Sequence, residues 1–374
     1  MKTKKTILCV IPAVIFIINS FACAYNQVID LGTLGGQRST ATSINDSGQI
    51  VGYTDGSLGV PRACLFDSTG KGNNINLGVL GGDLSYSEAH SINNNGQIAG
   101  YSDNSTSNPS ACLFDPTGWG ANSDLGSLGG SYSNAESINN HGQIVGYARN
   151  TSRNQSACLF DPTGHENNID LGSLGGNQSC AYSINDNGQI AGWAKSLIRS
   201  QVACLFDSSG NGNNIDLGDL GGGWSYAYSI NNNGQIIGYS YNSSGAWRAC
   251  LFDPSGNGNN INLGTLGGGE SEAYSNNDIG QIVGTARNGA GDSHACLFDA
   301  TGGGNNIDLN TLIAPASGWT LQYAYDINNN GWIVGFGMHN GQSHAYLLVV
   351  PEPVSALMFG LGGILLLGRK KKES

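Results

Sequence analysis

This sequence is poor in charged residues and in the apolar spacing that is typical of amphipathic helices. Of its 374 residues only 11% are charged, about half of the usual share, and 16 lysines and arginines face 27 acids. So few cations exclude a nucleic acid as the expected partner, because phosphate backbones are bound through a strong basic excess. Apolar residues at a 3.6-residue spacing are also missing from the repeated part of the chain, which excludes a helical solenoid.

What the sequence has in excess is glycine, with 58 residues, and internal repetition. The string Gly-Gln-Ile recurs every 46 to 48 residues, and the variant Gly-Trp-Ile follows 51 residues after the last copy. The glycines of this string are Gly48, Gly96, Gly142, Gly188, Gly234, Gly280 and, in the variant, Gly331. Two further motifs, Leu-Gly-x-Leu-Gly-Gly and Ala-Cys-Leu-Phe-Asp, repeat with the same period. The chain is therefore built from seven copies of one unit.

Each unit contains four short segments of strand-forming residues. In one copy they are residues 226–230, 235–239, 249–252 and 261–263, which are rich in aromatic and aliphatic residues and separated by Gly, Asn, Asp and Ser. Four antiparallel strands in about 46 residues are typical of one propeller blade. We therefore predict an all-β fold, a seven-bladed β-propeller of four-stranded blades over residues 25–350.

The two ends of the repeated region predict how the ring closes. The region begins with a lone fourth strand, Val28 to Leu31, and ends after a third strand, Ala345 to Leu348. The last blade would then take three strands from the C-terminus and its fourth strand from the N-terminus, which removes the exposed edge of an open ring. The expectation is a closed propeller with adjacent termini.

Two of the third strands carry a His-Ala sequence, at residues 294–298 (His-Ala-Cys-Leu-Phe) and 344–347 (His-Ala-Tyr-Leu). Together with the Asp-Leu-Gly-x-Leu-Gly-Gly and Ile-Asn-x-x-Gly-Gln-Ile-Val-Gly segments, the unit resembles the HAF extracellular repeat family. The resemblance covers nearly all of residues 25–350 and implies an exported repeat protein of unassigned biochemistry. Because Cys or Tyr replaces the motif Phe and five copies lack the His, no role of that His is carried over.

The first 24 residues have the three parts of a secretory signal peptide. Lysines at positions 2, 4 and 5 precede an apolar run over residues 7–18, and Ala22 and Ala24 form a small-x-small site for signal peptidase before Tyr25. A membrane anchor and a lipidated Cys23 are the alternatives. The apolar run is short for a bilayer core of ~30 Å, and the leucine that usually lies three residues before a lipidated cysteine is missing.

Residues 351–374 combine Pro351, Glu352 and Pro353 with an apolar stretch over 354–368 and a basic end that starts at Arg369 and Lys370. The stretch predicts a short transmembrane segment that the basic end stops on the cytoplasmic side. The three-part pattern resembles the PEP-CTERM sorting signal of Gram-negative bacteria. The resemblance implies processing by an exosortase-type enzyme, transient anchoring in the inner membrane, and delivery to the cell surface, outer membrane or biofilm matrix. A plain tail anchor is the alternative.

Loops on one face of the predicted propeller vary most in sequence. This top face is formed by the loops that join second to third strands and by the segments that join one unit to the next; the remaining turns form the bottom face. Variable loops on a rigid scaffold are where binding usually resides. The candidate ligand-binding residues are Arg62, Arg149, Arg153, Arg199, Trp224, Tyr241, Trp247, Arg248 and Arg287. We expect them to bind an extracellular polysaccharide or a surface partner; ordinary solvated loops are the alternative.

Enzyme motifs and metal-ligand spacings are missing from the sequence. The six histidines are scattered, with no Ser/His/Asp order, HExxH or GxSxG. The six repeated cysteines fall in equivalent strands, too far apart to pair and without CxxC spacing. We predict no catalytic residue, no metal and no cofactor. A purely structural matrix component and a propeller hydrolase or lyase acting on extracellular polymers are the rival functions.

The turns that join third to fourth strands suggest calcium binding as an alternative to the absence of a metal site. Residues 253–258 offer oxygens at the first, third and fifth positions before a glycine, as calcium loops do. No copy supplies the acidic ligand at position twelve, so calcium binding is the less favoured interpretation of these turns.

Overall fold

The computed structural model describes residues 26–165 and 167–350. These residues form seven four-stranded antiparallel sheets, the blades of a β-propeller. Outside the described residues lie the predicted signal peptide (1–24, with Ala22 and Ala24) and the predicted sorting segment (351–374, with Pro351, Glu352, Pro353, the 354–368 stretch, Arg369 and Lys370). In the part of the chain that is described, no helix is long and apolar enough to cross a membrane.

The first three blades follow one another along the chain. Blade one contains β2 (Gly35–Ile44), β3 (Ile50–Gly56), β4 (Pro61–Phe66) and β5 (Ile75–Asn76). Blade two contains β6 (Ser87–Ile92), β7 (Ile98–Asp103), β8 (Pro109–Phe114) and β9 (Ser123–Asp124). Blade three contains β10 (Gly129–Ile138), β11 (Ile144–Asn150), β12 (Gln155–Phe160) and β13 (Ile169–Asp170).

The remaining blades keep the same order, with one exception at the end. Blade four contains β14 (Gly175–Ile184), β15 (Ile190–Ser196), β16 (Val202–Phe206) and β17 (Ile215–Asp216). Blade five contains β18 (Gly221–Ile230), β19 (Ile236–Asn242), β20 (Trp247–Phe252) and β21 (Ile261–Asn262). Blade six contains β22 (Gly267–Asn276), β23 (Ile282–Asn288), β24 (Ser293–Phe298) and β25 (Ile307–Asp308), followed by the 3-10 helix η1 (Leu309–Leu312). Blade seven contains β26 (Trp319–Ile327), β27 (Ile333–His339), β28 (Gln342–Val349) and β1 (Gln27–Asp30).

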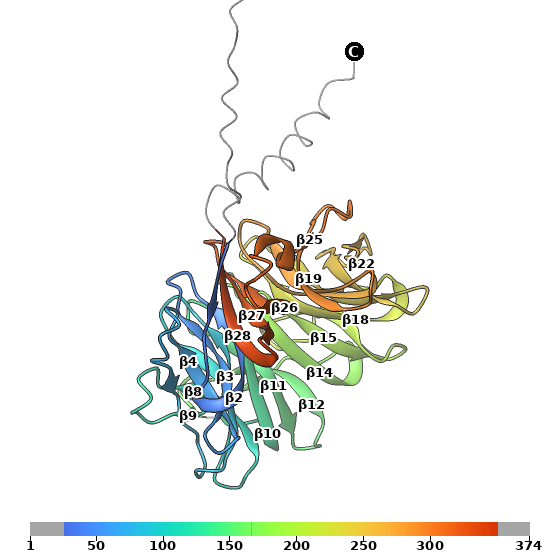
Figure 1. The fold of residues 1–374 in the computed structure, drawn as a ribbon. Helices are drawn as coiled ribbons and strands as arrows, with labels where there is room; N and C mark the ends of the chain where they lie inside the picture. The colour runs from blue at the N-terminus through green and yellow to red at the C-terminus, as the bar shows by residue number, and fades with distance from the viewer. Residues whose placement is uncertain (1–25, 166, 351–374) are drawn as a thin grey trace, which may run out of the picture.

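Blade seven is shared between the two ends of the chain. β1 pairs antiparallel with β28, so that Gln27 lies opposite Val349 and Asp30 opposite Tyr346. Figure 1 shows the dark-blue N-terminal strand running beside the red β28. The amide of Leu31 continues the ladder by donating to Ala345 O at 3.1 Å. The predicted fold is confirmed: a seven-bladed propeller closed by an N-terminal strand in the C-terminal blade.

The innermost strand of a blade is longer than predicted. In blade five the sequence indicates residues 226–230, whereas β18 begins at Gly221, opposite Asn242 of β19. The added residues pass close over the end of β19, where a Cβ on Gly222 would lie 2.6 Å from Asn242 O. The paired glycines of the Leu-Gly-x-Leu-Gly-Gly motif therefore permit a close approach of two backbones.

A β-bulge follows in each innermost strand. In blade five Ala227 lies opposite Gly238 and Ser229 opposite Ile237, which leaves Tyr228 without a partner. A bulge changes the direction of a side chain. The bulged residues of the seven blades are Thr42, His90, Glu136, Tyr182, Tyr228, Tyr274 and Tyr325. They lie between neighbouring innermost strands, where His90 contacts Glu136 and the tyrosines contact one another in series.

The apolar core lies between the blades. One cluster joins Val51 and Ala63 of blade one to Ile98 and Cys112 of blade two, and equivalent clusters follow around the ring. The seven cysteines of the described residues are free and buried. Desolvation raises the pKa of thiols such as that of Cys112 well above its usual value. The cysteines therefore act as small apolar core residues.

Two closed rings of hydrogen bonds tie the blades together on the bottom face. In one ring, the Nδ2 of an asparagine in each first-to-second-strand turn donates to the backbone oxygen of its equivalent in the next blade, from Asn45 to Asn93 at 3.0 Å and finally from Asn328 to Asn45 at 3.0 Å. In the other ring, the donor is the backbone amide of the residue that follows this asparagine. It donates to the side-chain Oδ1 of the Asp or Asn at the same position in the next blade, beginning with Asp46 to Asn94 at 2.9 Å. The rings surround a cavity of about 180 Å³.

Candidate functional site

Three of the predicted ligand-binding residues come together on the top face of blade five. The rings of Trp224 and Tyr241 lie 6.2 Å apart, and those of Tyr241 and Trp247 lie 5.8 Å apart. They come from β18, β19 and β20, whose register places all three near the top ends of these strands. Trp224 is 43% exposed. The three rings form an aromatic cluster that is exposed at Trp224 and half-buried at Tyr241 and Trp247.

The aromatic surface continues from the rim toward the inner strands. Tyr241 lies 6.4 Å from Tyr239, which stacks on Tyr226 at 4.8 Å. Tyr228 then leads to Tyr274 of blade six at 5.8 Å. Tyr226 and Tyr228 are two residues apart on β18, so strand alternation places both on the side of Tyr239, and Tyr228 lies 5.5 Å from Tyr239.

A pocket of about 110 Å³ opens beside Trp247. Its polar walls include Glu270, Glu272 and Arg287 of blade six, and Tyr323 of blade seven closes one side. Arg287 Nε donates to Glu270 Oε2 at 2.6 Å. Burial raises the pKa of Glu272, and a hydrogen bond from the Tyr274 hydroxyl at 2.9 Å partly opposes that rise. Trp247 and Arg287 therefore belong to one polar and aromatic pocket.

The other predicted arginines hold partners within the protein. Arg62 and Arg248 each donate to backbone oxygens of the segment that leads into the next blade, at Ser85 and Gly269. Arg199 bridges Asp216 and Asp219 at 3.0 Å each. These three guanidinium groups fasten the top loops to neighbouring elements.

Two arginines are left facing outward by the structure. The Arg149 guanidinium lies 5.6 Å from the centre of the Tyr132 ring. Arg153 sits at the tip of the β11–β12 loop with a positive φ of 62° and is exposed. Both belong to blade three, whereas the aromatic cluster lies on blade five, so these two arginines and the aromatic cluster occupy separate regions of the top face.

A partly buried charge cluster that the sequence did not indicate lies on blades two and three. His90 Nδ1 lies 3.3 Å from Glu136 Oε2, and His90 Nε2 lies 3.6 Å from Glu88 Oε2. Burial lowers the pKa of His90, but Glu136 and Glu88 outweigh this and raise it to about 10. The imidazolium neutralises part of the charge of the two carboxylates. Aligning the repeats on the bulge position would have placed His90 beside Glu136.

In the turns considered for calcium binding, the aspartate carboxylate accepts hydrogen bonds from groups of its own turn. In the β20–β21 turn, Asp253 Oδ1 accepts from Ser255 N at 3.0 Å and from Ser255 Oγ at 2.6 Å, and Asp253 Oδ2 accepts from Asn259 Nδ2 at 2.9 Å. The same arrangement recurs at Asp67, Asp207 and Asp299. These hydrogen bonds lower the pKa of Asp253 to about 2, led by that from the Ser255 side chain. The carboxylates thus act as turn caps.

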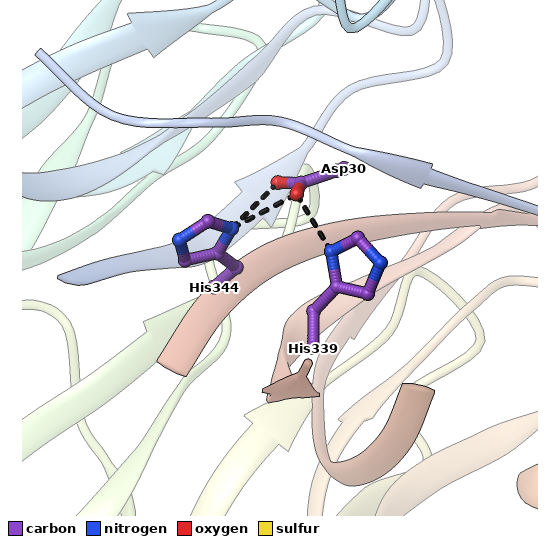
Figure 2. Close-up of side chains that lie close together, drawn as sticks. All are labelled: Asp30, His339 and His344. Atoms are coloured by element: carbon purple, nitrogen blue, oxygen red, sulfur yellow. Dashed lines mark hydrogen bonds and ion pairs between the residues drawn. The ribbon is translucent and has the colours of Figure 1, made fainter. Parts of the chain in front are cut away.

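The structure also brings together an aspartate and two histidines that are far apart in the sequence. His339 Nδ1 and His344 Nδ1 each lie 2.9 Å from Asp30 Oδ2 (Figure 2). In blade six, His294 Nδ1 lies 2.6 Å from Asp308 Oδ2. Both His-Ala sequences therefore pair with the aspartate of the fourth strand of their own blade.

No family model and no curated protein matches this chain. Among solved structures, YCF48 bound to D1 peptide is 13% identical, with a TM-score of 0.48, over 87% of this chain and 97% of that one. The WD40 β-propeller domain of Doa1 is 13% identical, with a TM-score of 0.45, over 85% and 96%. The β-propeller domain of the Trilobed protease from Pyrococcus furiosus is 10% identical, with a TM-score of 0.42, over 83% and 93%. The blade assignment rests on strand pairing rather than on these similarities.

Proposed function

We propose that this protein is an exported, non-enzymatic binding protein whose top face holds an extracellular polysaccharide. The observation that carries the proposal is the aromatic surface of Trp224, Tyr241 and Trp247 beside the pocket of Glu270 and Glu272. A sugar ring presents C–H groups on its face and hydroxyl groups at its edge. The C–H groups can pack on an aromatic face, and the hydroxyl groups can donate hydrogen bonds to carboxylates.

The pairing of carboxylates with cations supports binding rather than acid or base catalysis. Glu270 is held by Arg287, and Glu88 and Glu136 are held by His90. A general acid or base needs a free position toward the reacting group. The rival hydrolase or lyase would have to use Glu272, which accepts a hydrogen bond from Tyr274.

A glycan array probed with residues 25–350 tests the proposal. We expect selective retention of a family of related polysaccharides. Incubating the same fragment with the retained polymers, followed by chromatography of the products, separates binding from cleavage. Retention of no glycan, or release of shortened chains, would contradict the proposed function, and shortened chains would favour the hydrolase or lyase.

Export and surface delivery form the second part of the proposal, supported by the signal-peptide pattern and the PEP-CTERM resemblance. Replacing Pro351, Glu352 and Pro353 with alanines is expected to leave full-length protein in the inner membrane, because the sorting enzyme would no longer recognise it. Cell fractionation followed by mass measurement checks this. A plain tail anchor predicts the same mass and location for both proteins.

A further inference from the structure

Three side chains with metal-binding atoms converge where the ring closes. Asp30 lies on β1, His339 ends β27, and His344 lies on β28 (Figure 2). One ligand atom from each lies within 4.8 Å of the other two. We propose that these residues bind one divalent transition-metal ion, of the Zn²⁺ class, through the two Nδ1 atoms and a carboxylate oxygen of Asp30. This inference does not depend on the glycan proposal.

The ligand chemistry selects the class of ion. Two imidazole nitrogens and one carboxylate suit zinc and related first-row ions, whereas calcium and magnesium prefer oxygen ligands throughout. Bonds of about 2.0–2.1 Å in a tetrahedral site separate ligand atoms by about 3.3 Å. The Nδ1 to oxygen distances here are 2.9–3.1 Å. Small side-chain shifts would therefore open the site, and the partly exposed side chains leave a fourth position to water.

The surroundings hold two of the three ligands in place. The His339 ring stacks on Trp319 at 4.4 Å with an interplanar angle of 0°, and its Nε2 lies 3.1 Å from the Asn340 side-chain amide. Gly32 N donates to Asp30 Oδ1 at 2.9 Å. The Asp30 carboxylate is thereby oriented toward both histidines.

Both imidazoles can free Nδ1 for a metal ion by changing tautomer. A neutral ring that donates from Nδ1 to Asp30 carries its lone pair on Nε2, and moving the proton to Nε2 returns the lone pair to Nδ1. After the Asn340 amide group turns over, its oxygen can accept a hydrogen bond from the Nε2–H group of His339. Orientation of a metal-bound histidine by such a hydrogen bond is common.

Comparison with the other blades shows that the full set exists only in blade seven of the described residues. Blade six has His294 and Asp308, but Asn288 stands where blade seven has His339. Asn288 Oδ1 caps the β23–β24 loop by accepting from Ala290 N and Asp292 N. In blade seven a two-residue turn with positive φ at Asn340 and Gly341 replaces that loop. Position 339 is thereby released from capping and carries a histidine instead.

Metal binding at this place would be linked to ring closure. Asp30 belongs to the N-terminal strand and both histidines belong to the C-terminal hairpin, so one ion joins the two ends of the chain. An ion that binds only the closed ring stabilises it by mass action.

The test uses the full chain without a histidine tag, in mild detergent, stripped with a chelator and dialysed. Calorimetric titration with Zn²⁺ and metal analysis by mass spectrometry are expected to give one ion per chain. At a hundredfold excess over Kd, the melting temperature should rise by roughly 3–5 °C. Co²⁺ should give the visible absorption of a four-coordinate site.

The variants are taken from the other blades so that the fold is kept. His339→Asn installs the residue of blade six, and His344→Ser installs the residue that blades two and three carry as Ser110 and Ser156. Both should lose stoichiometric binding and the metal-dependent rise in melting temperature. His294→Ser, the same change in blade six, should bind Zn²⁺ like the parent.

Two results would overturn the proposal. One is a stripped parent chain that binds less than one ion or shows no Zn²⁺-dependent change in melting temperature, which would make the cluster a hydrogen-bond network alone. The other is unchanged Zn²⁺ binding in His339→Asn and His344→Ser, which would place the ion elsewhere.

Discussion

Removing β1 by deleting residues 26–31 is expected to lower the melting temperature by roughly 5–10 °C and to cause aggregation on heating. Leu31 is fully buried, and Val28 and Ile29 pack on two different core clusters. Losing this burial and one strand ladder costs roughly 3–6 kcal/mol, a large share of the 5–15 kcal/mol of a typical domain. The deletion also exposes the edge of β28, which invites pairing with another chain. Differential scanning calorimetry with light scattering measures both effects.

A permuted variant is the matched control for this deletion. Gln27 lies opposite Val349, so a two- to four-residue turn can join the end of β28 directly to a relocated β1. Moving residues 27–31 to that position should restore most of the lost melting temperature. An unchanged melting temperature in the deletion variant, or no recovery in the permuted one, would contradict the shared blade.

Replacing Asn139 by alanine is expected to cost about 3–5 kcal/mol, a large effect for one polar residue. Its Nδ2 donates to Gln143 Oε1 at 2.7 Å and to Asn185 O at 3.0 Å, and its Oδ1 accepts from His141 N and Gln143 N. Asn139 is only 4% exposed. Alanine leaves these buried partners unsatisfied at about 1–3 kcal/mol each, partly relieved by water from the adjacent cavity.

Asn211→Ala provides the control, because the exposed Asn211 donates only to the hydroxyl of Ser209 in its own turn. This change should stay within about 0.5 kcal/mol. Urea unfolding curves give both values from the shift of the midpoint. Similar costs for the two variants would mean that the asparagine ring does not hold the blades together.

The sequence predicted the number of blades and their closure because the same motifs recur and an unpaired fourth strand starts the series. It did not predict the bulges. A strand reads as strict alternation in the sequence, and the insertion of Tyr228 between Ala227 and Ser229 is set by pairing with β19. The pairing of Ser229, rather than Tyr228, with Ile237 therefore became visible only in the structure.

Only part of the candidate site could be predicted from the sequence. Loop position was enough to place Trp224, Tyr241 and Trp247 on one face. It did not show that arginines such as Arg199 are engaged by acids of the following segment. Asp30 and His344 are separated by nearly the whole chain and meet only because the ring closes with β1 beside β28.

The most direct test of top-face binding compares a tryptophan on each face of the propeller. Trp247→Ala removes a ring from the aromatic cluster and the pocket, whereas Trp119→Ala removes a ring that is 95% exposed in a bottom-face turn. Affinities for the polysaccharide selected on the array are measured by calorimetry, with circular dichroism to check folding. Trp247→Ala should weaken binding at least tenfold, about 1.4 kcal/mol, and Trp119→Ala should leave it unchanged. Unchanged binding in Trp247→Ala, or a loss confined to Trp119→Ala, would contradict the assignment of the binding site to the top face.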